Sequence, residues 1–241
     1  MKLNERLSVI ANEIKCGQTM ADVGTDHGFL PLYLFANGIC PKVIMTDLSG
    51  DSLNKAIEAF AEAQNHGITP LPSSDSISFR VGDGLKPIEH GEVDVVVIAG
   101  MGGVLMTQIL GSDISKTSTF KKIILQPRNG FGKLRYWLEN SGFEIVSEAL
   151  APEGKFICEI LVIKPPKTAV KLANLENYPD DIEFEMPRKL IPESQELFKT
   201  YLQEKINIEK KILAEIISGK SKNIERKNII EKRIEFLSLH L

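Results

Sequence analysis

Apolar runs alternate with amphipathic stretches over the first two thirds of the chain. Strand-like runs occupy residues 19–24, 42–47, 77–81, 93–99 and 122–126. Helical spacing of apolar residues marks the opening residues up to Ile14, a stretch beginning at Leu30, and residues 51–66, 104–110 and 133–140. A proline- and serine-containing loop is expected at 69–76. The alternation predicts five strand–helix units, which favours a mostly parallel sheet covered by helices.

The pattern changes after residue 142. Two further strand-like runs, 143–150 and 155–164, are separated by only four residues. Because so short a link cannot hold a crossover helix, the two runs are expected to form an antiparallel hairpin. The predicted fold is therefore α/β: a doubly wound seven-stranded sheet, mostly parallel, with one reversed strand.

The last third of the chain has a different character. Residues 165–192 carry five prolines and an acidic run, which indicates a connecting segment. From Glu193 onward apolar residues recur at helical spacing in two charged stretches, and Gly219 is placed to end the first of them. We expect an antiparallel, coiled-coil-like helical hairpin over 193–241. The predicted divisions are a ligand-binding domain at 1–164, the connecting segment at 165–192 and the hairpin at 193–241.

Composition narrows the class of protein. The 241 residues are 43% hydrophobic and 25% charged, which excludes a disordered or collagen-like chain. The three cysteines are too scattered for a disulfide framework or a zinc site, so no metal is expected. The longest apolar run, 93–110, is broken by Asp94 and three glycines, which argues against a membrane span. We expect a cytoplasmic protein that does not associate with a membrane and has no obligate protein partner.

Charge leaves a nucleic-acid partner open. The net charge of the chain is −3, which gives no indication of a polyanionic ligand. From Lys199 to the end, however, eight lysines and two arginines face six glutamates, a surplus of four positive charges. This surplus fits a solvated helical face, and it also fits contact with phosphates.

The first strand ends in a loop rich in acids and glycines. Asp22, Gly24, Thr25, Asp26 and Gly28 follow one another in the pattern DxGxDxG. The loop lacks the glycine spacing of a dinucleotide fingerprint, and two carboxylates suit a pyrophosphate poorly. Because ligands of open α/β sheets bind beyond the carboxyl ends of the strands, we expect this loop to face a cationic or neutral ligand.

Acids also end the next two strands. Asp47 lies 23 residues beyond Gly24, where a carboxylate can accept the hydroxyls of a ribose. Asp83 lies between Gly82 and Gly84 and is either a turn residue or an acceptor for an adenine amino group. Three acids at three successive strand ends favour a shared ligand site.

The fourth and fifth strands end in polar and glycine-rich sequences. Three glycines in four residues, 100–103, predict open space and exposed N–H groups at a pocket floor. Gln126 begins a polar cluster, 126–129, on the same edge of the sheet. His27 is the histidine of this neighbourhood, and it is either a catalytic group or a structural hydrogen-bonding residue.

Together these features resemble the class I S-adenosylmethionine-dependent methyltransferases, which share a Rossmann-like fold. Six motifs resemble more narrowly the bacterial tRNA (adenine-22-N1)-methyltransferases: TDHGFLP (25–31), VGDGL (81–85), IAGMGG (98–103), LQP (125–127), LRYWL (134–138) and GKFICEILV (154–162). That family also carries a C-terminal helical hairpin, so the resemblance covers nearly the whole chain. It implies S-adenosyl-L-methionine as cofactor, tRNA as partner and methyl transfer to N1 of an adenine in the D arm.

The resemblance also implies roles for individual residues. The cofactor-binding candidates are Asp22, Gly24, Thr25, Asp26, Gly28, Asp47, Leu48, Asp83, Gly84, Gly100 and Met101. The catalytic candidates are Asp26, His27 and Gln126, and the substrate-binding candidates are Gly102, Gly103, Pro127, Arg128 and Asn129. Asp26 is expected to stabilise the cationic product or hold the adenine amino group, or else to face the methionine ammonium group. Two positions depart from the family pattern: Arg128 stands between LQP and Asn129, and Thr46-Asp47 replaces Gly-Glu.

Two other functions remain open from the sequence. One is a methyltransferase that acts on a protein or a small molecule, with the hairpin serving only for dimerisation. The other is a nucleotide-dependent oxidoreductase, against which the missing dinucleotide fingerprint and the terminal hairpin both count.

Overall fold

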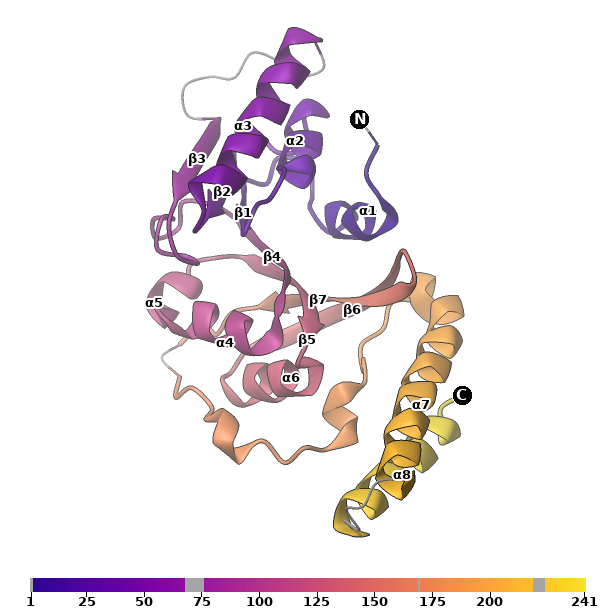
Figure 1. The fold of residues 1–241 in the computed structure, drawn as a ribbon. Helices are drawn as coiled ribbons and strands as arrows, with labels where there is room; N and C mark the ends of the chain where they lie inside the picture. Colours follow the sequence, from indigo (N-terminus) through magenta and orange to yellow (C-terminus); the bar gives the residue numbers. More distant parts are fainter. Residues whose placement is uncertain (1, 68–75, 169, 219–223) are drawn as a thin grey trace. The chain divides into compact units, whose positions relative to one another are not determined.

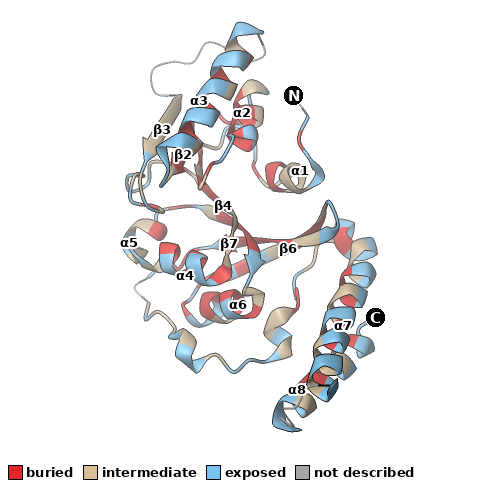
Figure 2. Cartoon of the chain, viewed as in Figure 1, coloured by how far each residue is buried: buried red, intermediate tan, exposed pale blue. Residues whose placement is uncertain are grey.

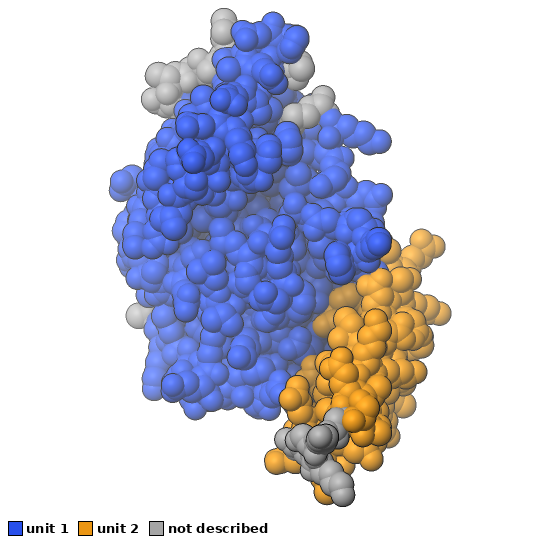
Figure 3. All heavy atoms as spheres, in the orientation of Figure 1, with its two compact units in different colours: residues 1–189 blue, residues 190–241 orange. Residues whose placement is uncertain are grey.

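The computed structural model describes residues 2–67, 76–168, 170–218 and 224–241. The chain separates into two compact units, Met1–Lys189 and Leu190–Leu241 (Figure 3). Residues 69–75 of the expected loop and Gly219, the expected end of the first hairpin helix, lie outside the described residues.

The first unit is built on one seven-stranded sheet (Figure 1). Its strands are β1 Met20–Val23, β2 Val43–Asp47, β3 Ile77–Val81, β4 Val95–Gly102, β5 Lys122–Asn129, β6 Glu144–Glu153 and β7 Phe156–Lys164, in the order β3-β2-β1-β4-β5-β7-β6. The first five strands are parallel to one another, and β7 is antiparallel to both β5 and β6. The predicted doubly wound sheet with one reversed strand is confirmed.

The α-helices in the described part of this unit are α1 Glu5–Asn12, α2 Phe29–Ala36, α3 Gly50–Asn65, α4 Gly103–Gly111, α5 Ile114–Thr117 and α6 Phe131–Asn140. The central strand β4 is fully buried over Val95–Ile98 (Figure 2), as its unbroken apolar sequence requires. α4 and α6 bury Met106, Leu110, Leu134 and Leu138 against the same core. The carboxyl ends of β1 to β5 therefore point to one edge of a rigid sheet.

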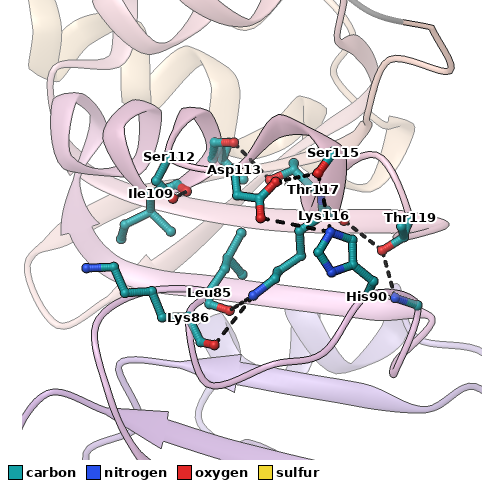
Figure 4. A network of polar contacts seen from close by, with 12 residues as sticks. Leu85, Lys86, His90, Ile109, Ser112, Asp113, Ser115, Lys116, Thr117 and Thr119 are labelled. Atoms are coloured by element: carbon teal, nitrogen blue, oxygen red, sulfur yellow. Dashed lines mark hydrogen bonds and ion pairs between the residues drawn. The ribbon is translucent and has the colours of Figure 1, made fainter.

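The connection from β3 to β4 corrects one expectation. Five strand–helix units were predicted, but residues 82–94 form turns instead of a helix. Neighbouring polar groups hold this segment in place (Figure 4). The Lys116 ammonium group donates to the carbonyl of Leu85 at 3.2 Å and to that of Lys86 at 3.4 Å, and Asp113 caps the short helix that carries Lys116. The loop after β3 is thus fixed from α5.

A buried ion cluster ties the segment after β7 to the sheet. The Arg135 guanidinium of α6 contacts Glu148 at 2.6 Å and Glu159 at 2.5 Å, and all three side chains are nearly inaccessible. Glu148 also accepts hydrogen bonds from the backbone N–H groups of Arg188 and Lys189. Most of the segment predicted as a connection therefore packs on the first unit, where it forms the short helices η1 Leu175–Asn177 and η2 Ile182–Glu185.

The second unit is a pair of helices. After the turn η3 Pro192–Ser194, α7 spans Gln195–Ser218 and α8 spans Ile224–Leu239, and the two helices contact each other. The Arg233 guanidinium of α8 donates to the Glu209 carboxylate of α7 at 2.8 Å. The expected helical hairpin is present.

Candidate active site at the carboxyl edge of the sheet

The loop after β1 is held by backbone and side-chain hydrogen bonds. The N–H groups of Gly24 and Thr25 both donate to the carbonyl of Thr46 at the end of β2. The buried Thr25 hydroxyl donates to the Asp22 carboxylate at 2.5 Å. Gly24 has φ of +80°, a conformation that favours glycine. The loop therefore presents the Asp22 carboxylate in a fixed position.

The Asp22 carboxyl group has a raised pKa. Burial raises its pKa from 3.8 to about 6. The nearby Asp47 carboxylate adds to this rise, whereas the Thr25 hydrogen bond and the Arg6 charge oppose it. A desolvated carboxylate of this kind is suited to a cationic ligand group.

Asp26 has the opposite surroundings. It is exposed, and its two oxygens contact Lys55 Nζ at 3.1 Å and His27 Nδ1 at 2.8 Å. The Lys55 hydrogen bond is the main reason that the pKa of Asp26 lies below its usual value. Asp26 therefore remains an anion through the neutral range. The His27 ring also stacks on Phe29, with ring centroids 5.2 Å apart and planes 9° apart.

A cavity of about 390 Å³ opens at this edge of the sheet. Seven predicted site residues line it: Asp22, Gly24, Asp26, His27, Gly28, Gly100 and Arg128. The other lining residues are Asn4, Arg6, Leu7, Phe29, Leu30 and Ala99. The cavity thus lies between the loop after β1, the last residues of β4 and β5, and the first residues of α1 and α2.

Arg6 is a lining residue that the sequence analysis did not single out. Its guanidinium donates to Glu153 Oε1 at 2.6 Å and to Gln126 Oε1 at 3.1 Å, so it ties α1 to β5 and β6. The Gly100 N–H donates to the same Gln126 oxygen, while the Gln126 amide nitrogen donates to the carbonyl of Pro127. Gln126 is buried and lies behind the cavity wall.

The acids after β2 and β3 lie outside the lining of this cavity. Asp47 is half-buried and accepts a hydrogen bond from the N–H of Ser49 at 2.7 Å, beside the exposed Leu48. Asp83 is exposed and pairs with Lys86 at 2.7 Å. Asp47 nevertheless ends β2, the neighbour of β1, and Asp83 follows β3, the neighbour of β2, so both continue the same edge of the sheet.

The glycines after β4 need a different explanation from the one predicted. Residues 100–102 extend β4 past a register shift, and a Cβ at Gly102 would lie 2.9 Å from the Asn129 side chain. A Cβ at Gly103 would lie 2.6 Å from the carbonyl oxygen of Gly130. The expectation of open space is therefore corrected at these two positions, where the missing side chains allow the β5–α6 turn to pack closely. At Gly100 the neighbouring group is the Arg128 guanidinium, at the cavity wall.

The remaining predicted residues do not line the cavity: Thr25, Asp47, Leu48, Asp83, Gly84, Met101, Gly102, Gly103, Gln126, Pro127 and Asn129. Thr25 and Gln126 are buried supports of the lining residues. Met101 lies over Gly24, since a Cβ there would be 2.2 Å from Met101 Cε.

Comparison with known proteins gives the family. The family described as "Methyltransferase domain" matches residues 3–161, a range that contains every predicted site residue. The chain belongs to this methyltransferase family. The match agrees with the row of acids along one edge of the sheet and with the resemblance found in the sequence motifs.

The names of individual relatives describe a narrower activity than the family description does. The chain is 33% identical over 162 residues to the tRNA (adenine(22)-N(1))-methyltransferase of Bacillus subtilis, a match over 67% of this chain and 65% of the relative. The crystal structure of the B. subtilis m1A22 tRNA methyltransferase superposes with a TM-score of 0.77 at 25% identity, covering 98% of this chain and 97% of that one. The crystal structure of Streptococcus pneumoniae Sp1610 in complex with S-adenosyl-L-methionine superposes with a TM-score of 0.71 at 25% identity. The superposition covers 97% of this chain and 96% of that one.

None of the described helices is long and apolar enough to cross a membrane. In the same part of the chain, no group of three or more His, Cys, Asp or Glu side chains is arranged to hold a metal ion. The three cysteines are free.

Proposed function

We propose that this protein transfers the methyl group of S-adenosyl-L-methionine to N1 of adenine 22 in the D arm of tRNA. The observation that carries the proposal is the cavity at the carboxyl edge of the sheet, lined by Asp22, Asp26 and His27. The proposal is also supported by the tRNA (adenine(22)-N(1))-methyltransferase of Bacillus subtilis, which matches 67% of this chain. Because the proposed substrate is tRNA, we also propose that the protein acts in the cytoplasm.

The residues at the cavity fit this cofactor. Asp22, a desolvated carboxylate, suits the ammonium end of the methionine part, and the Arg128 guanidinium at the cavity wall suits its carboxylate. Gly100 has positive φ, and a Cβ there would have the Arg128 guanidinium as its nearest neighbour at 3.6 Å, so the backbone can approach a ligand closely at this position.

The rest of the cofactor site follows the edge of the sheet. Asp47, with Leu48 beside it, would accept the ribose hydroxyls, and Asp83 with Gly84 would accept the adenine amino group. Thr25 and Met101 would support the site indirectly. Thr25 holds the Asp22 carboxylate through a hydrogen bond, and Met101 packs against Gly24.

The chemistry asks for positioning and charge stabilisation. When bound, S-adenosyl-L-methionine supplies an electrophilic methyl group that adenine N1 can displace in line, because N1 carries its own lone pair. Asp26 remains ionised and would stabilise the positive charge that develops on the adenine. His27 orients Asp26 through the 2.8 Å contact and can cover the base from one side. Gln126 would act as a positioning residue, since it holds Arg6 and the Gly100 N–H.

The substrate side would be formed by the ends of β4 and β5. Arg128 and Asn129 are exposed there, next to Pro127, Gly102 and Gly103. Because N1 lies on the Watson–Crick edge of adenine, the target base must leave the helical stack to reach the cavity. The helical hairpin would add contacts to the tRNA backbone through its surplus of basic residues.

A transfer assay tests the class of substrate. Purified protein is incubated with methyl-labelled S-adenosyl-L-methionine and, separately, with unmodified tRNA transcripts, a protein extract freed of nucleic acid, or a small-molecule extract. Label is expected in the tRNA fraction alone. Label in another fraction would support the alternative of a protein or small-molecule methyltransferase, and saturable quenching of NADH fluorescence would support an oxidoreductase.

A further inference from the structure

A second cavity adjoins the candidate active site. It has a volume of about 270 Å³ and is lined by Lys2, Leu3, Asn4, Leu7 and Phe29. Asn4, Leu7 and Phe29 also line the first cavity, so the two cavities share a wall formed by α1 and the start of α2. None of the roles proposed so far uses this second space.

The shared wall contains an exposed aromatic stack. Phe29 is the first residue of α2 and is 49% exposed, although it is a large apolar side chain. The His27 ring, 46% exposed, lies parallel to it. An aromatic pair that is stacked and still open to solvent offers a flat face of the kind on which nucleobases stack.

The other lining groups suit one nucleotide. Leu3 and Leu7 add apolar surface beside Phe29, and Lys2 provides a positive charge at the same cavity. A base with an apolar face and a phosphate with a negative charge match this combination. An acyl chain alone, or a peptide without an acidic group, would leave the lysine without an anionic partner.

We propose that the second cavity binds the nucleotide next to the target adenine, with its base stacked against Phe29 and its phosphate near Lys2. The proposal rests on the tRNA substrate proposed above. Turning the target base into the first cavity separates it from its neighbour, and the neighbouring base then loses a stacking partner. The Phe29 ring replaces that partner, on the wall that the two cavities share.

The test combines one side-chain change with removal of one base. Methylation kinetics are measured for the wild type and Phe29→Ala, on tRNA and on tRNA that carries an abasic linker on either side of the target adenine. Phe29→Ala is expected to raise KM for tRNA by roughly tenfold, as for the loss of one stacked base. The abasic linker on one side should cost the wild type a similar factor, and Phe29→Ala should show almost no additional loss on that transcript.

Controls make the outcomes distinct. Phe156→Ala removes a 75% exposed phenylalanine at the β6–β7 turn, outside both cavities, and should leave KM unchanged. The dissociation constant of S-adenosyl-L-methionine should be the same in all three proteins. Multiplying effects of Phe29→Ala and of each abasic linker would overturn the inference, as would a loss of cofactor affinity in Phe29→Ala. If the wild type itself methylates no tRNA, the proposed function has failed first.

Discussion

Asp22 near the end of β1 and Asp26 in the loop that follows are four residues apart, yet their surroundings shift their pKa values in opposite directions. Asp22 is desolvated, and its pKa is raised to about 6. Asp26 is exposed beside Lys55, which lowers its pKa. Such a separation is typical of acids with different tasks in one site. This separation supports the proposed division of roles, with cofactor binding at Asp22 and charge stabilisation at the substrate by Asp26.

The first prediction concerns Asp26. Asp26→Asn is expected to lower kcat by about 10- to 100-fold, because the amide cannot offset the charge that develops on the adenine. The dissociation constant of S-adenosyl-L-methionine, measured by calorimetry, should not change. Asp51→Asn, which alters an exposed acid of the first turn of α3, is the matched control. Weakened cofactor binding by Asp26→Asn would instead place Asp26 at the methionine ammonium group.

The second prediction concerns the stability associated with Asp22. Since folding raises its pKa from 3.8 to about 6, ionisation destabilises the folded state, fully so above pH 6 and not at all below about pH 4. Asp22→Asn keeps an acceptor for Thr25 and is expected to raise the free energy of unfolding by about 1–3 kcal/mol above pH 6.5.

Chemical denaturation at pH 4 and pH 7 checks this expectation. The gain from Asp22→Asn should vanish at the lower pH, and an equal gain at both would contradict the assignment. In the wild type, cofactor affinity should fall as the pH drops through 6, while Asp22→Asn should bind the cofactor weakly at every pH.

At the scale of elements, the contact between the start of α4 and the turn after β5 depends on a missing side chain. Gly103→Ala would place a Cβ 2.6 Å from the carbonyl oxygen of Gly130, a backbone atom that cannot rotate away. We expect a loss of about 1–3 kcal/mol in the free energy of unfolding.

The chain offers a matched control for this change. Gly50 is also the first residue of a helix, α3, and a Cβ there would meet its nearest neighbour, Val81, at 4.0 Å. Gly50→Ala should be neutral or stabilising by up to about 1 kcal/mol. Equal melting temperatures for the two variants would contradict the close-packing explanation and would support the original expectation of open space at Gly103.

The elements differ in how well their sequence predicted them. The strands and the β6–β7 hairpin were predictable because unbroken apolar runs and a four-residue link leave few other arrangements. The β3–β4 connection was not, since its conformation depends on Lys116, more than 20 residues away. The sequence did not reveal the role of Arg6 either, because its partners Gln126 and Glu153 are far along the chain.

At the scale of the whole molecule, two separate units would meet one substrate. The first unit holds the reacting groups, and the hairpin carries the basic surplus. Lys210, Lys211 and Lys232 are exposed on α7 and α8. Their replacement by alanine is expected to weaken tRNA binding several-fold and to reduce the slope of log K against log salt by about 2, as for the loss of two or three phosphate contacts.

The control for this prediction removes the same charge elsewhere. A triple alanine variant at the exposed residues Lys15, Lys167 and Lys171 of the first unit should change neither the affinity nor the salt slope. Filter binding at four salt concentrations suffices. Equal effects of the two triple variants would show that net charge, and not the hairpin, governs tRNA binding.

The most direct test of the account is the position of the methyl group. Unmodified tRNA is treated with the protein and methyl-labelled S-adenosyl-L-methionine, digested, and analysed by mass spectrometry of its nucleosides and fragments. We expect labelled 1-methyladenosine at position 22, and no label when adenine 22 is replaced by guanine. Cofactor binding without any labelled nucleoside, or label that persists after the replacement, would contradict the proposed function.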